Sequence, residues 1–400
     1  MKKICCAERI SIAAIALSVL WSCGDPVYLG TPYLDRYGTS GSEPENPSVP
    51  QKRSLYVTGV EYPEDYNWQP ELGGGSVEAR LFLMKDGRRI VEINVGARYH
   101  VSADADMHRC IGDHLYTDYS TDDETIVKRD GVELFRYPDR EMIHSMLIDG
   151  DDVYTLGSPR SGTGFTYRRN GAIVIVKGSA NILSGLSRDG DHIVFTYEDV
   201  ITSTGATRYR YYYVEDDEVR AIPVTEDVVR VEDARVIDGN VHYIAAFSGK
   251  SYRIYYAGDR SFELRRAGAS SVSECRLVYD GGEVFVKGKA SNENVFWHGA
   301  EIKACSQNTV ALDWCADKEN VYHLTSNHSS RTLLVFRQNM STLVLPSQYV
   351  FIYSGCMAAY DGKYCLAAAN RSKGDAPVLW TDGEANEYDF NGLFTSVSYQ

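Results

Sequence analysis

Short runs of apolar and aromatic residues alternate with polar turns along this chain, and one arrangement of them recurs eight times. In each copy an apolar run ends at a two-residue turn, and a second apolar run follows. Successive turns are separated by 44, 40, 46, 42, 40, 40 and 44 residues. A period of this size, sustained over most of the chain, indicates a repeat architecture. The eight turns are Asp86-Gly87, Asp130-Gly131, Asn170-Gly171, Asp216-Asp217, Gly258-Asp259, His298-Gly299, Gln338-Asn339 and Asp382-Gly383.

The residues at these turns predict tight β-hairpins. Asp-Gly and Asn-Gly pairs readily adopt the positive φ angles that two-residue hairpin loops require. The flanks of the third turn agree with this, since Phe165 to Tyr167 precedes it and Ala172 to Val176 follows it. Both runs are rich in β-branched and aromatic residues, as strands are.

A second tight turn recurs earlier in each unit. It is clearest at Asp149-Gly150, and related turns occur at Asp189-Gly190 and Asp280-Gly281. Each unit therefore contains four predicted antiparallel strands, which matches one blade of a β-propeller. We predict an all-β fold, a β-propeller of eight four-stranded blades. Seven blades is the alternative, if the weakly marked fourth or seventh unit is an insertion.

The two ends of the repeat region predict how the ring closes. The first unit begins at Arg53-Ser54-Leu55, and no innermost strand precedes it. The segment from Leu393 to Tyr399 is a predicted strand with no unit after it. We therefore expect the C-terminal strand to join the first blade as its innermost strand, which leaves no free edge there.

The N-terminal region has the pattern of an export signal. Lys2 and Lys3 precede an apolar stretch from Ile10 to Leu20, as in a secretory signal peptide. The sequence Leu20-Trp21-Ser22-Cys23 resembles the lipobox of exported bacterial lipoproteins, in which the cysteine is acylated and becomes the mature N-terminus. The resemblance implies a lipid-anchored protein of the bacterial envelope, either periplasmic or on the cell surface. An ordinary signal peptide, or an uncleaved anchor, is the alternative.

The chain is thus expected to divide into three parts. Residues 1–22 form the signal peptide, and residues 23–51 comprise the lipidated Cys23 and a flexible tether rich in Gly, Pro, Ser and Thr. Residues 52–400 form a single propeller domain. The net charge of −14 argues against binding to nucleic acid or to anionic lipid. We expect a monomer that meets the membrane through its lipid alone.

Six of the nine cysteines fall within the propeller region. They could form disulfides in 15 arrangements. Several lie in predicted strands, however, where free thiols pack as small apolar groups, and we expect mostly free, buried cysteines. The sequence contains no CxxC spacing, so we expect no zinc site, no other metal and no cofactor. The six are Cys110, Cys275, Cys305, Cys315, Cys356 and Cys365.

Candidate binding residues lie in the loops that the repeat leaves between its tight turns. The longest of these loops, in the first unit, contains Tyr62, Tyr66 and Trp68 among carboxylates and amides. Aromatic rings beside polar groups suit stacking against a glycan, and they equally suit a protein contact, where Tyr and Trp are enriched. Alternatively, Trp68 binds nothing and folds back to cover the blade.

A second set of candidates precedes the second unit. Asp104 and Asp106, with His108, could hold a cation or form a catalytic carboxylate pair, although such residues are more often solvated loop charges. No residue is assigned a catalytic role, because the sequence contains no Gly-x-Ser-x-Gly motif.

These observations favour a membrane-tethered, non-catalytic binding propeller that engages a glycan or an envelope protein. One alternative is a carbohydrate-active enzyme, a polysaccharide lyase or glycosidase, whose acidic residues would come from different blades. Another is a scaffold that organises protein partners. The sequence does not identify the ligand.

Overall fold

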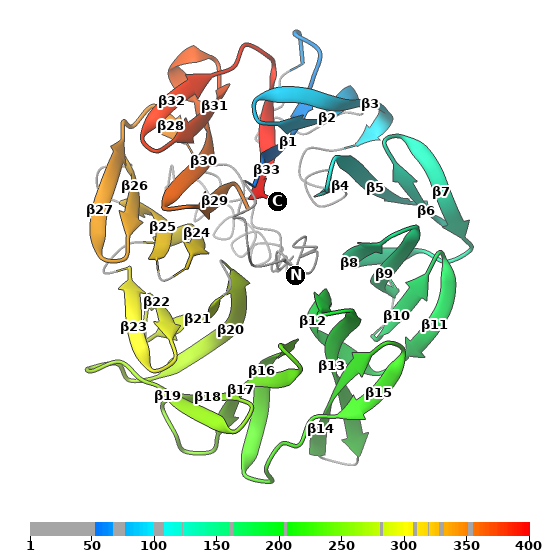
Figure 1. The fold of residues 1–400 in the computed structure, drawn as a ribbon, viewed down its shortest axis with the longest axis vertical. Helices are drawn as coiled ribbons and strands as arrows, with labels where there is room; N and C mark the ends of the chain where they lie inside the picture. Colours follow the sequence, from blue (N-terminus) through cyan, green and yellow to red (C-terminus); the bar gives the residue numbers. More distant parts are fainter. Residues whose placement is uncertain are drawn as a thin grey trace, which may run out of the picture.

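The computed structural model describes residues 53–66, 77–99, 108–121, 123–159, 163–203, 206–280, 283–306, 310–318, 320–327, 332–350 and 355–400. These residues form eight antiparallel sheets arranged in a ring (Figure 1), which is a β-propeller. We number the blades 1 to 8 in chain order. The prediction of eight blades is confirmed, and the weakly marked fourth and seventh units are complete four-stranded blades.

The first four blades each contain four strands. Blade 1 comprises β1 (Leu55–Glu61), β2 (Val77–Lys85), β3 (Arg88–Tyr99) and β33 (Gly392–Tyr399). Blade 2 comprises β4 (His108–Ile111), β5 (His114–Ser120), β6 (Thr125–Arg129) and β7 (Val132–Tyr137). Blade 3 comprises β8 (Glu141–Asp149), β9 (Asp152–Pro159), β10 (Phe165–Arg169) and β11 (Ala172–Lys177). Blade 4 comprises β12 (Ala180–Asp189), β13 (His192–Ser203), β14 (Ala206–Glu215) and β15 (Glu218–Ala221).

The remaining blades follow the same order from the channel outward. Blade 5 comprises β16 (Val228–Ile237), β17 (Asn240–Phe247), β18 (Arg253–Ala257) and β19 (Arg260–Leu264). Blade 6 comprises β20 (Val272–Asp280), β21 (Glu283–Ala290), β22 (Glu293–His298) and β23 (Glu301–Cys305). Blade 7 comprises β24 (Val310–Asp317), β25 (Asn320–Asn327), β26 (Thr332–Arg337) and β27 (Met340–Leu345). Blade 8 comprises β28 (Tyr349–Val350), β29 (Met357–Tyr360), β30 (Lys363–Asn370), β31 (Ala376–Thr381) and β32 (Glu384–Glu387), with β28 and β29 both paired to β30 and a 3-10 turn at Arg371–Lys373.

The hairpin turns explain why the sequence repeats Asp or Asn at their first position. Asp86 and Asn170 adopt φ angles of 48° and 50°, a region that Asp and Asn tolerate better than most residues. Their side chains also accept hydrogen bonds from the backbone of the second strand of the blade. Asp86 Oδ1 accepts a hydrogen bond from the backbone N–H of Leu55 at 2.9 Å, and Asn170 Oδ1 accepts one from Val153 at 2.8 Å.

The ring closes as the sequence predicts. Strand β33 pairs with β1 over its whole length (Figure 1), with a register shift between Thr58 and Gly59. The last residue, Gln400, exchanges two backbone hydrogen bonds with Ser54, at 3.0 and 3.1 Å. Its side-chain Oε1 also accepts the N–H of Gly112 at 2.9 Å, which ties blade 1 to blade 2.

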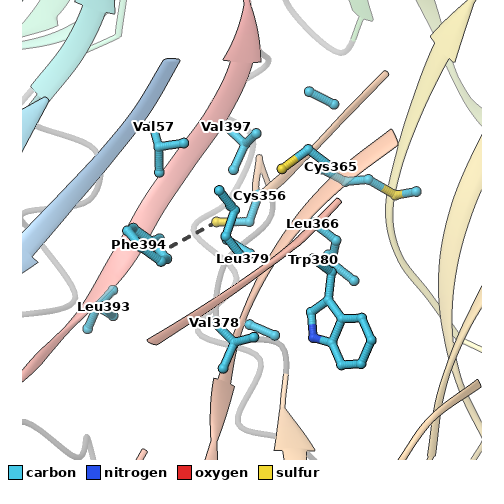
Figure 2. Close-up of a cluster of buried hydrophobic side chains, with 14 of the residues drawn as sticks. Val57, Cys356, Cys365, Leu366, Val378, Leu379, Trp380, Leu393, Phe394 and Val397 are labelled. Atoms are coloured by element: carbon cyan, nitrogen blue, oxygen red, sulfur yellow. Dashed lines mark hydrogen bonds between the residues drawn. The ribbon is translucent and has the colours of Figure 1, made fainter. Parts of the chain in front are cut away.

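Apolar side chains fill the spaces between neighbouring blades. Figure 2 shows such a cluster between blades 8 and 1, in which Val57 and Phe394 of blade 1 lie near Leu379 of blade 8. The Cys356 thiol donates to the Phe394 carbonyl there, at 3.7 Å. All six cysteines of the described propeller are free, and five are buried, as expected from the sequence. Burial raises the pKa of the Cys365 thiol to about 12, so it is a packing group and not a reactive thiolate.

Polar side chains also join successive innermost strands. Asp233 of blade 5 accepts the backbone N–H of Leu277 in blade 6 at 2.8 Å. Ser145 of blade 3 accepts the N–H of Leu186 in blade 4 at 2.9 Å in the same way. No helix within the described ranges is long and apolar enough to cross a membrane.

Candidate functional site

The antiparallel order of each blade gives the propeller two unlike faces. The tight turns between first and second strands and between third and fourth strands lie on one face, which we call the turn face. The connections between second and third strands, and those between blades, lie on the other, which we call the loop face. Binding and catalytic residues are found disproportionately on loops that a rigid scaffold positions, so the loop face is the more favourable place for a site.

The loop face is uneven, because one connection is far longer than its equivalents. In blade 1 the chain leaves β1 at Glu61 and enters β2 at Val77. The corresponding connection in blade 2 runs from Thr121 to Glu124, and in blade 6 from Ser291 to Asn292. Connections as long as the one in blade 1 are uncommon in compact domains, and those that occur are usually either functional or linker segments.

The start of this long connection is fixed to the entry of the last strand. The Tyr62 N–H donates to the Asn391 carbonyl at 2.7 Å. The Asn391 side-chain amide donates to the carbonyls of Pro63 and Tyr66, at 2.8 Å for Tyr66. A single Asn thus holds three backbone positions of the connection, those of Tyr62, Pro63 and Tyr66, against blade 1.

The two described aromatic candidates of this connection pack against each other. The Tyr62 and Tyr66 ring centroids lie 5.1 Å apart with planes tilted by 35°. Tyr62 is only 4 % exposed, so it supports the loop and offers no stacking face. Tyr66 is half-buried and packs against the apolar cluster of blades 8 and 1. Trp68 lies outside the described residues.

A cation lies on an aromatic surface beside this loop. The Arg89 guanidinium lies 4.3 Å from the Phe82 ring centroid and 5.3 Å from that of Phe390. Its Nη1 donates to the Glu61 carboxylate at 2.6 Å. Arg89 and Glu61 are each about one quarter exposed, at 28 and 26 %, so both can meet a ligand at the loop face. Neither residue could be selected from the sequence, because a charge pair between β1 and β3 has no signature in a linear pattern.

The second set of predicted site residues is only partly described. Asp104, Asp106 and the lipidation candidate Cys23 lie outside the described residues. His108 is 6 % exposed, and its Nε2 forms a hydrogen bond with the Thr395 hydroxyl at 2.7 Å. His108 therefore joins blade 2 to the closing strand β33. No group of three or more potential metal ligands occurs in the part of the chain that the structure describes.

A polar cluster lies on the inner strands of blades 2 and 3. His144 Nε2 forms a hydrogen bond with the Ser158 hydroxyl at 2.6 Å. Burial, with the nearby Arg109 guanidinium, lowers the pKa of His144, so it is neutral at pH 7. Arg109 pairs with Asp118, whose pKa is raised because burial outweighs that pairing. A serine nucleophile also needs a group that orients the imidazole and donors for an oxyanion. Among the described residues no hydrogen bond to the second nitrogen of His144 is found, and we assign the pair no reaction.

Comparison with known proteins finds a limited likeness to solved structures and identifies no family for this chain. No protein-family model matches the chain, and no curated protein matches its sequence. Among solved structures, it is similar to the β-propeller domain of the Trilobed protease from Pyrococcus furiosus, with a TM-score of 0.42 and 11 % identity over 66 % of this chain and 86 % of that one. It is also similar to an acylaminoacyl peptidase from Pyrococcus horikoshii, with a TM-score of 0.41 and 11 % identity over 70 % of this chain and 50 % of that one. A quinohemoprotein alcohol dehydrogenase from Pseudomonas putida gives a TM-score of 0.43 and 7 % identity, over 74 % of this chain and 67 % of that one.

Proposed function

We propose that this protein is a binding propeller of the bacterial envelope, held at a membrane by lipid on Cys23, and that it binds a glycan at the loop face of blade 1. The proposal rests chiefly on one observation. The longest second-to-third-strand connection of the propeller begins on the loop face and is fixed there by Asn391. Fixing a loop in one conformation lowers the conformational entropy lost when a ligand binds.

The groups near this loop suit a glycan. Tyr66 offers part of an aromatic ring, while Glu61 and Arg89 offer an acceptor and donors beside it. A sugar presents both an apolar ring face and hydroxyls that donate and accept hydrogen bonds. The sequence of the connection adds Trp68, Asn67 and Gln69, which carry further groups of these kinds.

The anchoring is tested by the mature N-terminus. Mass spectrometry of the membrane fraction should find a diacylglycerol-modified Cys23 as the first residue, and Cys23→Ala should leave the protein unprocessed or soluble. An unmodified cysteine at that position would remove the anchor from the proposal.

The ligand is tested with the full chain, purified in detergent, on an array of bacterial and host glycans. We expect binding that falls at least several-fold in Tyr66→Ala and in Asn391→Ala. Tyr279→Ala is the matched control, because Tyr279 is 43 % exposed near the tight turn of β20 and β21, on the turn face. If Tyr66→Ala and Tyr279→Ala behave alike, the loop face of blade 1 is not the site. If an envelope protein and no glycan is bound, with the same dependence on Tyr66, the ligand class is wrong. Cleavage of a bound glycan would make the protein an enzyme.

A further inference from the structure

The junction between blades 4 and 5 buries a carboxylate that is only partly paired. Glu198 lies on β13 and is 0 % exposed. Its Oε1 accepts a hydrogen bond from Asn181 Nδ2 at 2.9 Å, and Arg230 Nη2 of blade 5 lies 3.6 Å from the same oxygen. The other oxygen, Oε2, is also buried and accepts no hydrogen bond from any described residue. A buried acceptor without a donor costs free energy, and the cost is larger for a charged group.

Two other glutamates of low exposure in the blades have a hydrogen-bond donor for each carboxylate oxygen. Both oxygens of Glu141 in blade 3 accept hydrogen bonds from Arg168. Glu232 in blade 5 accepts from Arg253 at 2.5 Å with Oε1 and from the Cys275 N–H at 2.8 Å with Oε2. Among these three carboxylates, Glu198 differs in that one of its oxygens has no hydrogen-bond donor within the described ranges.

An exposed cation lies beside this carboxylate. Arg230 is 56 % exposed, and its guanidinium lies 5.7 Å from the Tyr209 ring centroid. Tyr209 belongs to the hairpin of β13 and β14, which continues pairing toward the loop face as far as Ser203 and Ala206. Because Arg230 is exposed, its side chain has room to rotate at the junction, and we take this rotation as the route by which a ligand at the loop face reaches Tyr209 and Glu198.

The groups at this junction would be satisfied by a ligand that both donates and accepts hydrogen bonds. Glu198 Oε2 needs a donor, while Arg230 and Asn181 supply donors of their own. The opposite charges of Glu198 and Arg230 balance, which favours an uncharged ligand. The flat ring of Tyr209 suits an apolar ring face. Neighbouring hydroxyls on a sugar ring satisfy all of these conditions together.

We propose that the junction of blades 4 and 5 is a saccharide subsite, in which Glu198 accepts a hydrogen bond from a sugar hydroxyl and Tyr209 packs against the sugar ring. This inference rests on the proposed function, because it takes a glycan as the ligand. It adds a second contact on the loop face, separate from the long connection of blade 1.

The test measures binding of the full chain to neutral cello-, xylo-, malto- and N-acetylchito-oligosaccharides, and to whichever glycans bind on the array. Glu198→Gln keeps the shape of the side chain but replaces one acceptor with a donor. We expect it to weaken binding about tenfold or more, as for the loss of a hydrogen bond to a charged group. The melting temperature should stay equal to that of the wild type or rise, because a neutral amide is easier to bury, so that lost binding is not lost folding. Tyr209→Leu should weaken binding as well.

The outcomes separate this inference from the proposed function. Binding that Tyr66→Ala weakens and Glu198→Gln leaves unchanged would overturn the subsite and retain the site at blade 1. Binding weakened by Glu198→Gln and unchanged in Tyr66→Ala would retain the subsite and overturn the site at blade 1. The subsite is also wrong if no glycan binds the wild type. It is wrong as well if a crystal structure shows a single ordered water on Glu198 Oε2 and the affinity is unchanged in Glu198→Gln.

Discussion

The imidazole of His323 lies parallel to the ring of Phe336, with centroids 5.0 Å apart and 7° between the planes. The Phe296 ring of blade 6 is also stacked with it, with centroids 5.9 Å apart and 22° between the planes. His323 is 1 % exposed, and burial lowers its pKa to about 4. It is thus a neutral packing group at the interface of blades 6 and 7.

This burial predicts a loss of stability in acid. The unfolded chain binds a proton at His323 near its ordinary pKa of about 6.5, whereas the folded protein does so only near 4. The folded state is therefore penalised progressively as pH falls from about 6.5 to about 4, by about 3 kcal/mol in all. Urea unfolding across this range should show that His323→Gln, although less stable at pH 7, loses less stability on acidification than the wild type.

His192 provides a control of opposite sign. Its hydrogen bond to Asp216 raises its pKa. Its stabilising effect is complete below the unfolded pKa and disappears as pH rises through the folded value. The variant His192→Gln should therefore be more sensitive to acid than the wild type. If His323→Gln matches the wild type in its dependence on pH, His323 does not titrate as described.

The side chain of Asp86 should stabilise blade 1 beyond its effect on the turn. Asp86→Asn should be nearly neutral, because Asn170 accepts the equivalent hydrogen bond in blade 3. Asp86→Gly keeps the positive φ angle but loses the hydrogen bond that the Asp86 side chain accepts from the Leu55 N–H. It should therefore lower the free energy of unfolding by about 1 kcal/mol. Asp86→Ala also places a Cβ in the left-handed region, which adds about 1 kcal/mol. Equal stability of the Gly and Ala variants would contradict this account.

Gly59 is needed where the ring closes. A Cβ at this position would overlap the Phe82 ring and come within 2.8 Å of the Leu393 carbonyl oxygen in β33. Gly59→Ala should destabilise the protein by about 1–3 kcal/mol, as overpacking does, and should increase amide exchange in β1 and β33. Gly178→Ala is the matched control, since a Cβ there meets no atom within 4 Å and should cause little change.

The buried pair of Arg168 and Glu141 should be costly to break. Both side chains are 4 % exposed, and Arg168 Nη2 lies 2.8 Å from Glu141 Oε1. Arg168→Met leaves Glu141 buried without its cation, and should cost about 3–5 kcal/mol of unfolding free energy. The neighbouring Arg169 pairs with Asp152 at the surface, where screening by water makes ion pairs weak. Arg169→Met should therefore change the denaturation midpoint very little. Similar midpoints for both variants would show that Arg168 is not the structural partner of Glu141.

The sequence by itself determined the blades, their number and the way in which the ring closes. These features depend on turn residues that recur along the chain. Examples are Asp86-Gly87 and Asn170-Gly171, which occupy positions that need positive φ angles. Closure could be predicted because the first unit lacks an innermost strand, and the last predicted strand belongs to no other unit. The last strand can therefore complete the first blade. Free cysteines could be expected for a similar reason, since burial follows from position in a strand.

Only the tertiary structure decided which polar residues hold the fold and which are open to a ligand. Tyr62 and His108 attracted attention by residue type, yet both are buried. Asn391, which fixes the long connection of blade 1, lies more than 300 positions from it in the chain. Nothing in the linear sequence distinguishes Glu141 from Glu198. Glu141 accepts hydrogen bonds from Arg168 of its own blade, whereas one oxygen of Glu198 has no donor among the described residues. Contacts between strands far apart in sequence determine this difference, and a pattern of neighbouring residues does not contain them.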